Sequence, residues 1–163
     1  MKRKLILLRH AKSAWDTGAP DDHARPLNKR GRRDAPRLAA RLVELGWEPD
    51  RILASDSERT RETYERMKSA LGKHPKPKFT AKLYMADLAA LRRQLTKSYD
   101  KVRTVLALGH NPGWEEAVKT LTGEEVRLGT CNAALLTTKA DTWAEALTRT
   151  DWKLEAVVRP KEL

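Results

Sequence analysis

Two histidines and two arginines of this chain stand close to the ends of apolar runs, and their types suit phosphoryl transfer. Arg9 and His10 follow one short run, Arg59 lies shortly after a second, and His110 closes a third. A neutral imidazole can attack phosphorus and a second can donate a hydrogen bond, while guanidinium groups bind phosphoryl oxygens with forked hydrogen bonds. Phosphoryl transfer depends mainly on positioning and charge stabilisation, which such a set supplies.

The elements expected to position these residues alternate between strands and helices, which predicts an α/β fold with a largely parallel sheet. Strands are expected over about 4–8, 51–54, 79–83, 102–108, 133–138 and 152–158, and helices over about 28–45, 57–71, 88–98, 114–121 and 143–148. Pro36 predicts a kink or a late start in the first helix. Because the carboxyl ends of parallel strands meet at one sheet edge, we expect the histidines and arginines to line a single pocket.

Length and composition limit the possible binding partners and the cellular compartment. The 163 residues suffice for one domain with a substantial core, expected to span 1–163. The formal charge of +11 fits nucleic acid, phosphorylated small molecules, phosphoproteins and anionic membranes. A single cysteine, Cys131, excludes an intramolecular disulfide framework and favours a reducing compartment, so the cytoplasm is expected. The first apolar run is too short for a secretory signal, and no run is long enough to cross a membrane.

Other phosphate chemistries lack their sequence signatures. No Gly-x-x-x-x-Gly-Lys-Ser/Thr loop occurs, so a P-loop is not expected. Thr137 stands six positions after Cys131, where a cysteine-dependent tyrosine phosphatase would need arginine. No Asp-x-Asp pair is present for an aspartyl-phosphate enzyme. A route through histidine is the chemistry that remains.

Four motifs in order resemble those of the histidine phosphatase (phosphoglycerate mutase-like) superfamily. Their residues are Arg9-His10-Ala11, with alanine for the glycine of Arg-His-Gly; Ser55, Arg59 and Thr63, as in Ser-x-x-x-Arg-x-x-x-Thr; and Gly109-His110-Asn111-Pro112, as in its distal histidine motif. The remaining motif, Arg25-Pro26-Leu27-Asn28-Lys29-Arg30-Gly31, lies second along the chain and is similar to an element of the small SixA-like phosphohistidine phosphatases, with asparagine for threonine. The resemblance extends from residue 4 to about residue 114.

The resemblance implies a three-layer α/β/α sandwich with a mostly parallel central sheet. It also implies an enzyme that uses no metal and no organic cofactor. By resemblance, His10 is the nucleophile that becomes phosphorylated, and Arg9, Arg59 and His110 hold the phosphoryl oxygens. Ser13 is a further candidate for substrate binding, because the loop after His10 can contact phosphate.

A proton donor for the leaving group is the missing part of this resemblance. Residues 83–87, where a mutase-type acid would be expected, contain no glutamate, so the candidates are Asp16, Asp21 and Asp22. The leaving group of a phosphohistidine is an imidazole nitrogen, which departs more readily than an alkoxide and needs less help from an acid. We therefore expect a metal-independent phosphohydrolase acting on phosphohistidine in a protein. The alternative with the same mechanism is a small-molecule phosphatase of broad specificity.

A basic stripe provides an alternative from a different class of protein. It consists of Lys29, Arg30, Arg32, Arg33, Arg37 and Arg41. On a helix this stripe could follow a phosphate backbone, as in a module that binds nucleic acid or phosphoproteins and whose catalytic site has decayed. No stacking platform or DNA-binding module accompanies it, so a solvated, substrate-steering face is expected. We expect neither an obligatory nucleic-acid partner nor a membrane, and the oligomeric state stays open.

Overall fold

A computed structural model describes all of residues 1–163, and its elements alternate between strands and helices. They are, in order, β1 (Lys2–Arg9), α1 (Lys29–Glu44), β2 (Arg51–Ser55), α2 (Glu58–Met67), β3 (Lys78–Thr80), α3 (Leu88–Gln94), β4 (Thr104–Gly109), α4 (Gly113–Thr122), β5 (Ala133–Lys139), α5 (Trp143–Ala146) and β6 (Lys153–Val158). Short 3-10 turns lie at Ala81–Leu83, Lys97–Tyr99 and Pro160–Glu162. None of the helices combines the length and the apolarity needed to cross a bilayer.

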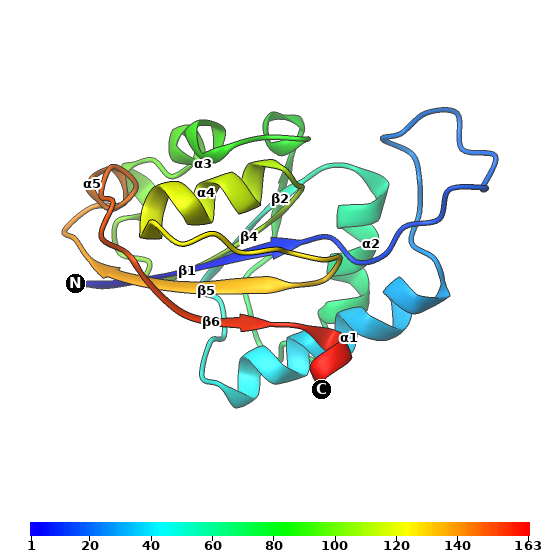
Figure 1. Ribbon diagram of the computed structural model, residues 1–163, viewed down its shortest axis with the longest axis horizontal. Helices are drawn as coiled ribbons and strands as arrows, with labels where there is room; N and C mark the ends of the chain where they lie inside the picture. The colour runs from blue at the N-terminus through cyan, green and yellow to red at the C-terminus, as the bar shows by residue number, and fades with distance from the viewer.

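The six strands form one mixed sheet in the order β3-β2-β4-β1-β5-β6 (Figure 1). β3, β2, β4 and β1 pair in parallel, whereas β5 is antiparallel to both of its neighbours. β5 is therefore the one strand that runs against the other five, and the prediction of a mostly parallel sheet is confirmed. β1 lies inside the sheet and pairs in register with β4, so that Arg9 stands beside Gly109.

Helices cover both faces of the sheet, as the expected three-layer sandwich requires. Side chains alternate along β1, so Leu5 and Leu7 enter one core while Ile6 and Leu8 enter the other. α1 and α2 pack over Ile6 and Leu8, and α3, α4 and α5 pack over Leu5 and Leu7. Figure 1 shows these two groups of helices on opposite sides of the sheet. Because both faces are buried, the central strands read as continuous apolar runs in the sequence.

The start of α1 fixes the loop that follows His10. Asn28 caps the helix by accepting a hydrogen bond from the Gly31 amide at 2.9 Å, and its own amide donates to the Lys12 carbonyl at 2.9 Å. A Cβ on Gly31 would lie 2.2 Å from the Lys12 oxygen, so this close approach requires glycine. Pro36 lies inside the helix. The late start that it suggested is wrong, because the Asn28 cap sets the N-terminus earlier.

Three expected boundaries differ from the structure by three residues or more. The strand expected at 79–83 is only Lys78–Thr80, because the chain then turns and the Thr80 hydroxyl accepts from the Lys82 amide at 3.2 Å. The helices expected at 57–71 and 88–98 end earlier, as α2 at Met67 and α3 at Gln94. The first of these differences lies at the same sheet edge as the histidines, because Thr80, which ends β3, pairs with Ser55 of β2.

Candidate active site

The carboxyl ends of β1, β2 and β4 bring the predicted residues to one pocket. His10 directly follows β1, His110 directly follows β4, and Ser55 ends β2. Because Arg9 and Gly109 are register partners, the two histidines leave neighbouring strands together, and their ring centroids lie 5.4 Å apart. This pocket, called the first pocket below, has a volume of about 230 Å³ and is lined by Arg9, His10, Lys12, Ser13, Trp15, Asp22, Arg25, Arg59, Met85, His110, Asn111 and Thr130.

The two ring nitrogens of buried His10 have different partners. Nδ1 lies 2.7 Å from the Ala11 carbonyl oxygen, which can only accept, so Nδ1 carries the proton. Nε2 accepts a hydrogen bond from Arg59 Nε at 3.3 Å and therefore holds a lone pair. Burial, with the nearby charges of Arg59 and Arg9, lowers the pKa of His10 to about 4. A neutral ring with a lone pair on Nε2 is the form that can attack phosphorus.

His110 is oriented by the end of β2. Its Nε2 lies 2.8 Å from Ser55 Oγ, and that oxygen also accepts from the Ser57 amide at 3.2 Å. Its Nδ1 lies 3.5 Å from Arg59 Nη2. A guanidinium can only donate, so Nδ1 is the acceptor and the ring proton lies on Nε2. Burial and the neighbouring His10 and Arg59 lower the pKa of His110 to about 3, so this ring is also neutral at neutral pH.

Arg59 is buried, and its guanidinium is held in a fixed orientation. Nη1 donates to the Asp22 carbonyl oxygen at 2.8 Å, and Nη2 donates to Asp22 Oδ2 at 3.0 Å. Thr63 supports the backbone behind it, because its Oγ1 donates to the Arg59 carbonyl at 2.6 Å and accepts from the Ala11 amide at 3.0 Å. A rigid, planar cation beside both imidazole rings is well suited to bind phosphoryl oxygens.

Arg9 and Ser13 complete the set of predicted residues at the first pocket. Arg9 Nη1 donates to the Leu128 carbonyl at 3.1 Å, while its buried Nε has no hydrogen-bond partner. Ser13 is buried, and its Oγ accepts from Arg25 Nη1 at 3.1 Å. The structure thus brings every residue predicted to bind the phosphoryl group into one pocket.

Of the three candidate acids, only Asp22 lines the first pocket. Asp16 and Asp21 are exposed and do not line it. Asp21 instead accepts a hydrogen bond from the Ala24 amide at 2.9 Å within its own turn. The structure therefore leaves one carboxylate that could act on a bound phosphoryl group.

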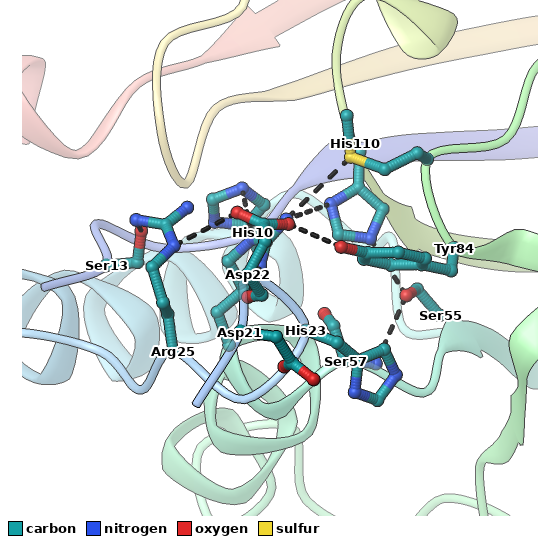
Figure 2. A network of polar contacts seen from close by, with 12 residues as sticks. His10, Ser13, Asp21, Asp22, His23, Arg25, Ser55, Ser57, Tyr84 and His110 are labelled. Carbon is teal, nitrogen blue, oxygen red and sulfur yellow. Dashed lines mark hydrogen bonds and ion pairs between the residues drawn. The ribbon is translucent and has the colours of Figure 1, made fainter. Parts of the chain in front are cut away.

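The Asp22 carboxylate is surrounded by donors. Figure 2 shows it between Arg25 and Tyr84: Arg25 Nε donates to Oδ1 at 3.1 Å, and the Tyr84 hydroxyl donates to Oδ2, which Arg59 also contacts. The Tyr84 hydrogen bond and the guanidinium groups of Arg59 and Arg25 lower the pKa of Asp22 to about 2. This carboxylate is therefore ionised in the present arrangement and has no proton to donate.

Sequence reasoning gave no role to Tyr84 or Arg25. Tyr84 packs edge-to-face on His110, with ring centroids 5.4 Å apart, and belongs to the segment 83–87, where the resemblance led us to expect only a carboxylate. Arg25 belongs to a recognised motif, and its guanidinium lies 3.7 Å from the ring centroid of Trp15. The motif was the one available signal for Arg25, whereas nothing near Tyr84 in the sequence indicated its contacts.

Among residues 1–163, no three His, Cys, Asp or Glu side chains are grouped as a metal site requires.

The three-layer fold, with histidines and arginines gathered at the edge of its sheet, defines a class of phosphoryl-transfer proteins. The chain belongs to the histidine phosphatase superfamily (branch 1), whose family model matches residues 5–106. His110 lies beyond the matched stretch, so its place beside His10 comes from the geometry above.

Related sequences and solved structures indicate to which branch of the superfamily the chain is similar. An uncharacterized chloroplastic protein of Arabidopsis thaliana is 42% identical over 172 residues, which cover 98% of this chain and 79% of that protein. A structure from Agrobacterium tumefaciens assigned to the phosphohistidine phosphatase SixA has a TM-score of 0.80 at 25% identity, covering 97% of this chain and 98% of the other. The protein histidine phosphatase SixA with tungstate gives 0.81 at 21% identity, covering 98% of each chain. The chain is therefore a SixA-like member of this phosphatase superfamily.

We expect His10 to stay unprotonated well below the pH at which an ordinary imidazole titrates. Its pKa of about 4 means that the lone pair on Nε2 is lost only as the pH falls through that value. An NMR titration of the His10 ring should therefore show a midpoint near 4 rather than near the usual value of about 6.5. A midpoint between about 6 and 7 would contradict the inferred effect of burial and neighbouring cations.

Proposed function

We propose that this protein is a phosphohistidine phosphatase in which His10 is the nucleophile. His10 Nε2 attacks phosphorus and forms a P–N bond while the P–N bond to the imidazole of the substrate breaks. Water then attacks the phosphorylated His10, which releases inorganic phosphate and restores the neutral ring. Arg9, Arg59 and His110 bind the phosphoryl oxygens in both steps, where fixed donors stabilise the developing charge.

His110 contributes a hydrogen bond after its Nδ1 gains a proton. In this structure its ring proton is directed at Ser55, and Nδ1 lies toward Arg59. A dianionic phosphoryl group beside these residues raises the pKa of His110, because an opposite charge favours the protonated ring. Nδ1 then donates to a phosphoryl oxygen, and the imidazole of the substrate departs neutral when its second ring nitrogen carries a proton.

The hydrogen bonds that occupy the Asp22 carboxylate are the observation that carries the choice of substrate. It is the only carboxylate that lines the first pocket, and its contacts with Arg59, Arg25 and Tyr84 keep it ionised. An alkoxide leaving group needs a positioned acid, whereas an imidazole nitrogen departs with much less assistance. A pocket without a neutral carboxyl therefore favours a phosphoramidate such as phosphohistidine. The likeness to SixA supports a phosphorylated protein as the bearer of that group.

The basic stripe on α1 gives less support to nucleic-acid binding than its sequence suggested. Every arginine of the stripe has an acidic partner within ion-pair distance: Arg30, Arg33 and Arg37 with Asp34, Arg32 with Glu62, and Arg41 with Glu44. These charges are partly balanced within the protein, which favours a solvated face.

The single domain and the cytoplasmic location stay predictions, and the Arabidopsis relative is chloroplastic.

A panel of substrates tests the proposal. A phosphohistidine peptide, the matching phosphoserine peptide and a sugar phosphate are incubated with the enzyme in EDTA, and phosphate release is followed. We expect kcat/KM for phosphohistidine to exceed that for phosphoserine by about 100-fold or more, because the site supplies little acid catalysis. Equal or faster turnover of the sugar phosphate would support the small-molecule alternative. Loss of activity in EDTA would contradict metal independence.

A further inference from the structure

A second pocket of about 240 Å³ lies beside the first and is lined by four cations. They are Arg30 from α1, Arg127 from the loop before β5, and Arg159 and Lys161 from the C-terminal segment. Thr130 lines both pockets, so they are adjacent. A concave surface with this charge attracts anions, and nothing in the proposed chemistry of His10 uses it.

The positive charge of the second pocket is only partly balanced by the protein. Asp34 is its one acidic residue, is 3% exposed, and already has Arg30 at 3.5 Å and two further arginines of α1 within 3.8 Å. Arg159 lies 3.7 Å from Glu162. The side chains of Arg127 and Lys161 are exposed and have neither an acidic partner nor a hydrogen bond. Two cations of the second pocket are therefore free to bind an anion.

A buried side-chain amide lines the second pocket and orders its loop. Asn132 is 6% exposed, and its Oδ1 accepts from the Gly129 amide at 2.8 Å and from Arg159 Nη1 at 2.8 Å. Arg159 Nη1 also donates to the Arg127 carbonyl at 2.7 Å. These bonds fix the loop and one cation before any ligand arrives, and such preorganisation lowers the entropy cost of binding.

The same loop forms a wall of the first pocket. Its Leu128 carbonyl accepts from Arg9 Nη1 at 3.1 Å and from Asn111 Nδ2 at 2.8 Å. The Cys131 amide donates to the His10 carbonyl at 2.9 Å. A ligand in the second pocket would thus lie against the segment that positions Arg9 and His10.

We propose that the second pocket binds a second anionic group, a carboxylate or a phosphoryl group, carried by the same substrate whose phosphoryl group enters the first pocket. The shared Thr130 makes the two pockets neighbours, so an extended peptide could present its phosphohistidine to one and a nearby acidic side chain to the other. This inference rests on the proposed function for its substrate. It makes the enzyme selective for phosphohistidine in acidic surroundings.

Two peptides and two double variants test this selectivity. The phosphohistidine peptides are identical except that the residues flanking the phosphohistidine are glutamate in one and glutamine in the other. The Arg127→Ala/Lys161→Ala variant removes the free cations of the second pocket. The matched control, Lys101→Ala/Arg103→Ala, removes an arginine and a lysine that are exposed just before β4, at the opposite edge of the sheet.

We expect the wild type to have a KM about fivefold lower for the glutamate peptide, with kcat unchanged, as two ion pairs of modest strength would give. The Arg127→Ala/Lys161→Ala variant should lose this preference, and the control should keep it. Equal KM values for the two peptides in the wild type, or a preference that persists in the Arg127→Ala/Lys161→Ala variant, would overturn the inference.

A binding measurement separates this inference from the proposed function. Inorganic phosphate is titrated into the protein, and the amide resonances of His110 report on the first pocket while those of Gly129 and Arg159 report on the second. We expect both sets to shift in the wild type and only the first set in the Arg127→Ala/Lys161→Ala variant. If no phosphohistidine peptide is hydrolysed, the proposed function fails, and the Gly129 and Arg159 shifts still decide whether the second pocket binds anions. If the resonances of both pockets shift but KM is the same for the two peptides, the second pocket binds a free oxyanion. That result would overturn the inference that the second anionic group is carried by the substrate.

Discussion

Replacing His10 with alanine is expected to lower kcat for phosphohistidine hydrolysis by about 10⁴-fold or more, the scale seen when a nucleophile is removed. The variant lacks the Nε2 lone pair that Arg59 contacts at 3.3 Å. Rapid-quench experiments with radiolabelled phosphate on the substrate provide a direct readout. The wild type should carry an acid-labile phosphoryl group on the protein during turnover, and the His10→Ala variant should carry none.

A matched histidine elsewhere in the fold controls for this result. His74 bonds Tyr64 through Nε2 at 2.8 Å and does not line the first pocket. His74→Ala should therefore keep the activity and the phosphoryl label of the wild type. A His10→Ala variant that retains more than about 1% of the activity, or that still becomes labelled, would remove His10 from the role of nucleophile.

Replacing Arg59 with alanine is expected to lower kcat/KM by about 10² to 10³-fold, the usual effect of removing one donor to a developing negative charge. Arg59 is 2% exposed and contacts both imidazole rings, so its removal takes a donor from the centre of the pocket. Arg59→Lys should recover little of the loss, because a lysine ammonium lacks the planar fork that binds two oxygens. The inhibition constant of orthovanadate, an analogue of the phosphoryl group, should rise in both variants.

A second arginine of α2 supplies the control for Arg59. Arg66 has a half-exposed side chain that lies 3.6 Å from Glu62, and exposed pairs of this kind contribute under about 1 kcal/mol. Arg66→Ala should leave kcat/KM and vanadate inhibition unchanged. Full activity in Arg59→Lys would show that charge alone suffices and would contradict the forked contact proposed for the guanidinium.

The central strands and α1 could be predicted from the sequence because their signals are local. β4 and β1 are buried on both faces and read as continuous apolar runs. Asn28 and Gly46 mark the two ends of α1, and the glycine adopts a positive φ of 76°. The meeting of His10 and His110 followed from the rule that parallel strands end at one sheet edge.

The surroundings of Asp22 could not be predicted, because they depend on segments far apart in the chain. Tyr84 comes from a loop 62 positions away and carries no periodic signal. Without that contact and those of Arg59 and Arg25, Asp22 appears in the sequence as an ordinary acid and a candidate proton donor. The lowering of its pKa is a property of the folded pocket. The second pocket could not be predicted for the same reason, since α1, the loop before β5 and the C-terminal segment come together only in the folded protein.

The inner position of β1 also determines when the first pocket can form. This strand is synthesised long before its partners: Leu5 pairs with Val105 on one side, and Lys2 pairs with Lys139 on the other. Pairings so distant along the chain slow folding, because a long loop must close before the contact is made. A nascent chain therefore carries Arg9 and His10 on a strand without neighbours until β4 and β5 have been synthesised. A chain interrupted before β4 therefore contains His10 but not His110, and no pocket can form between them.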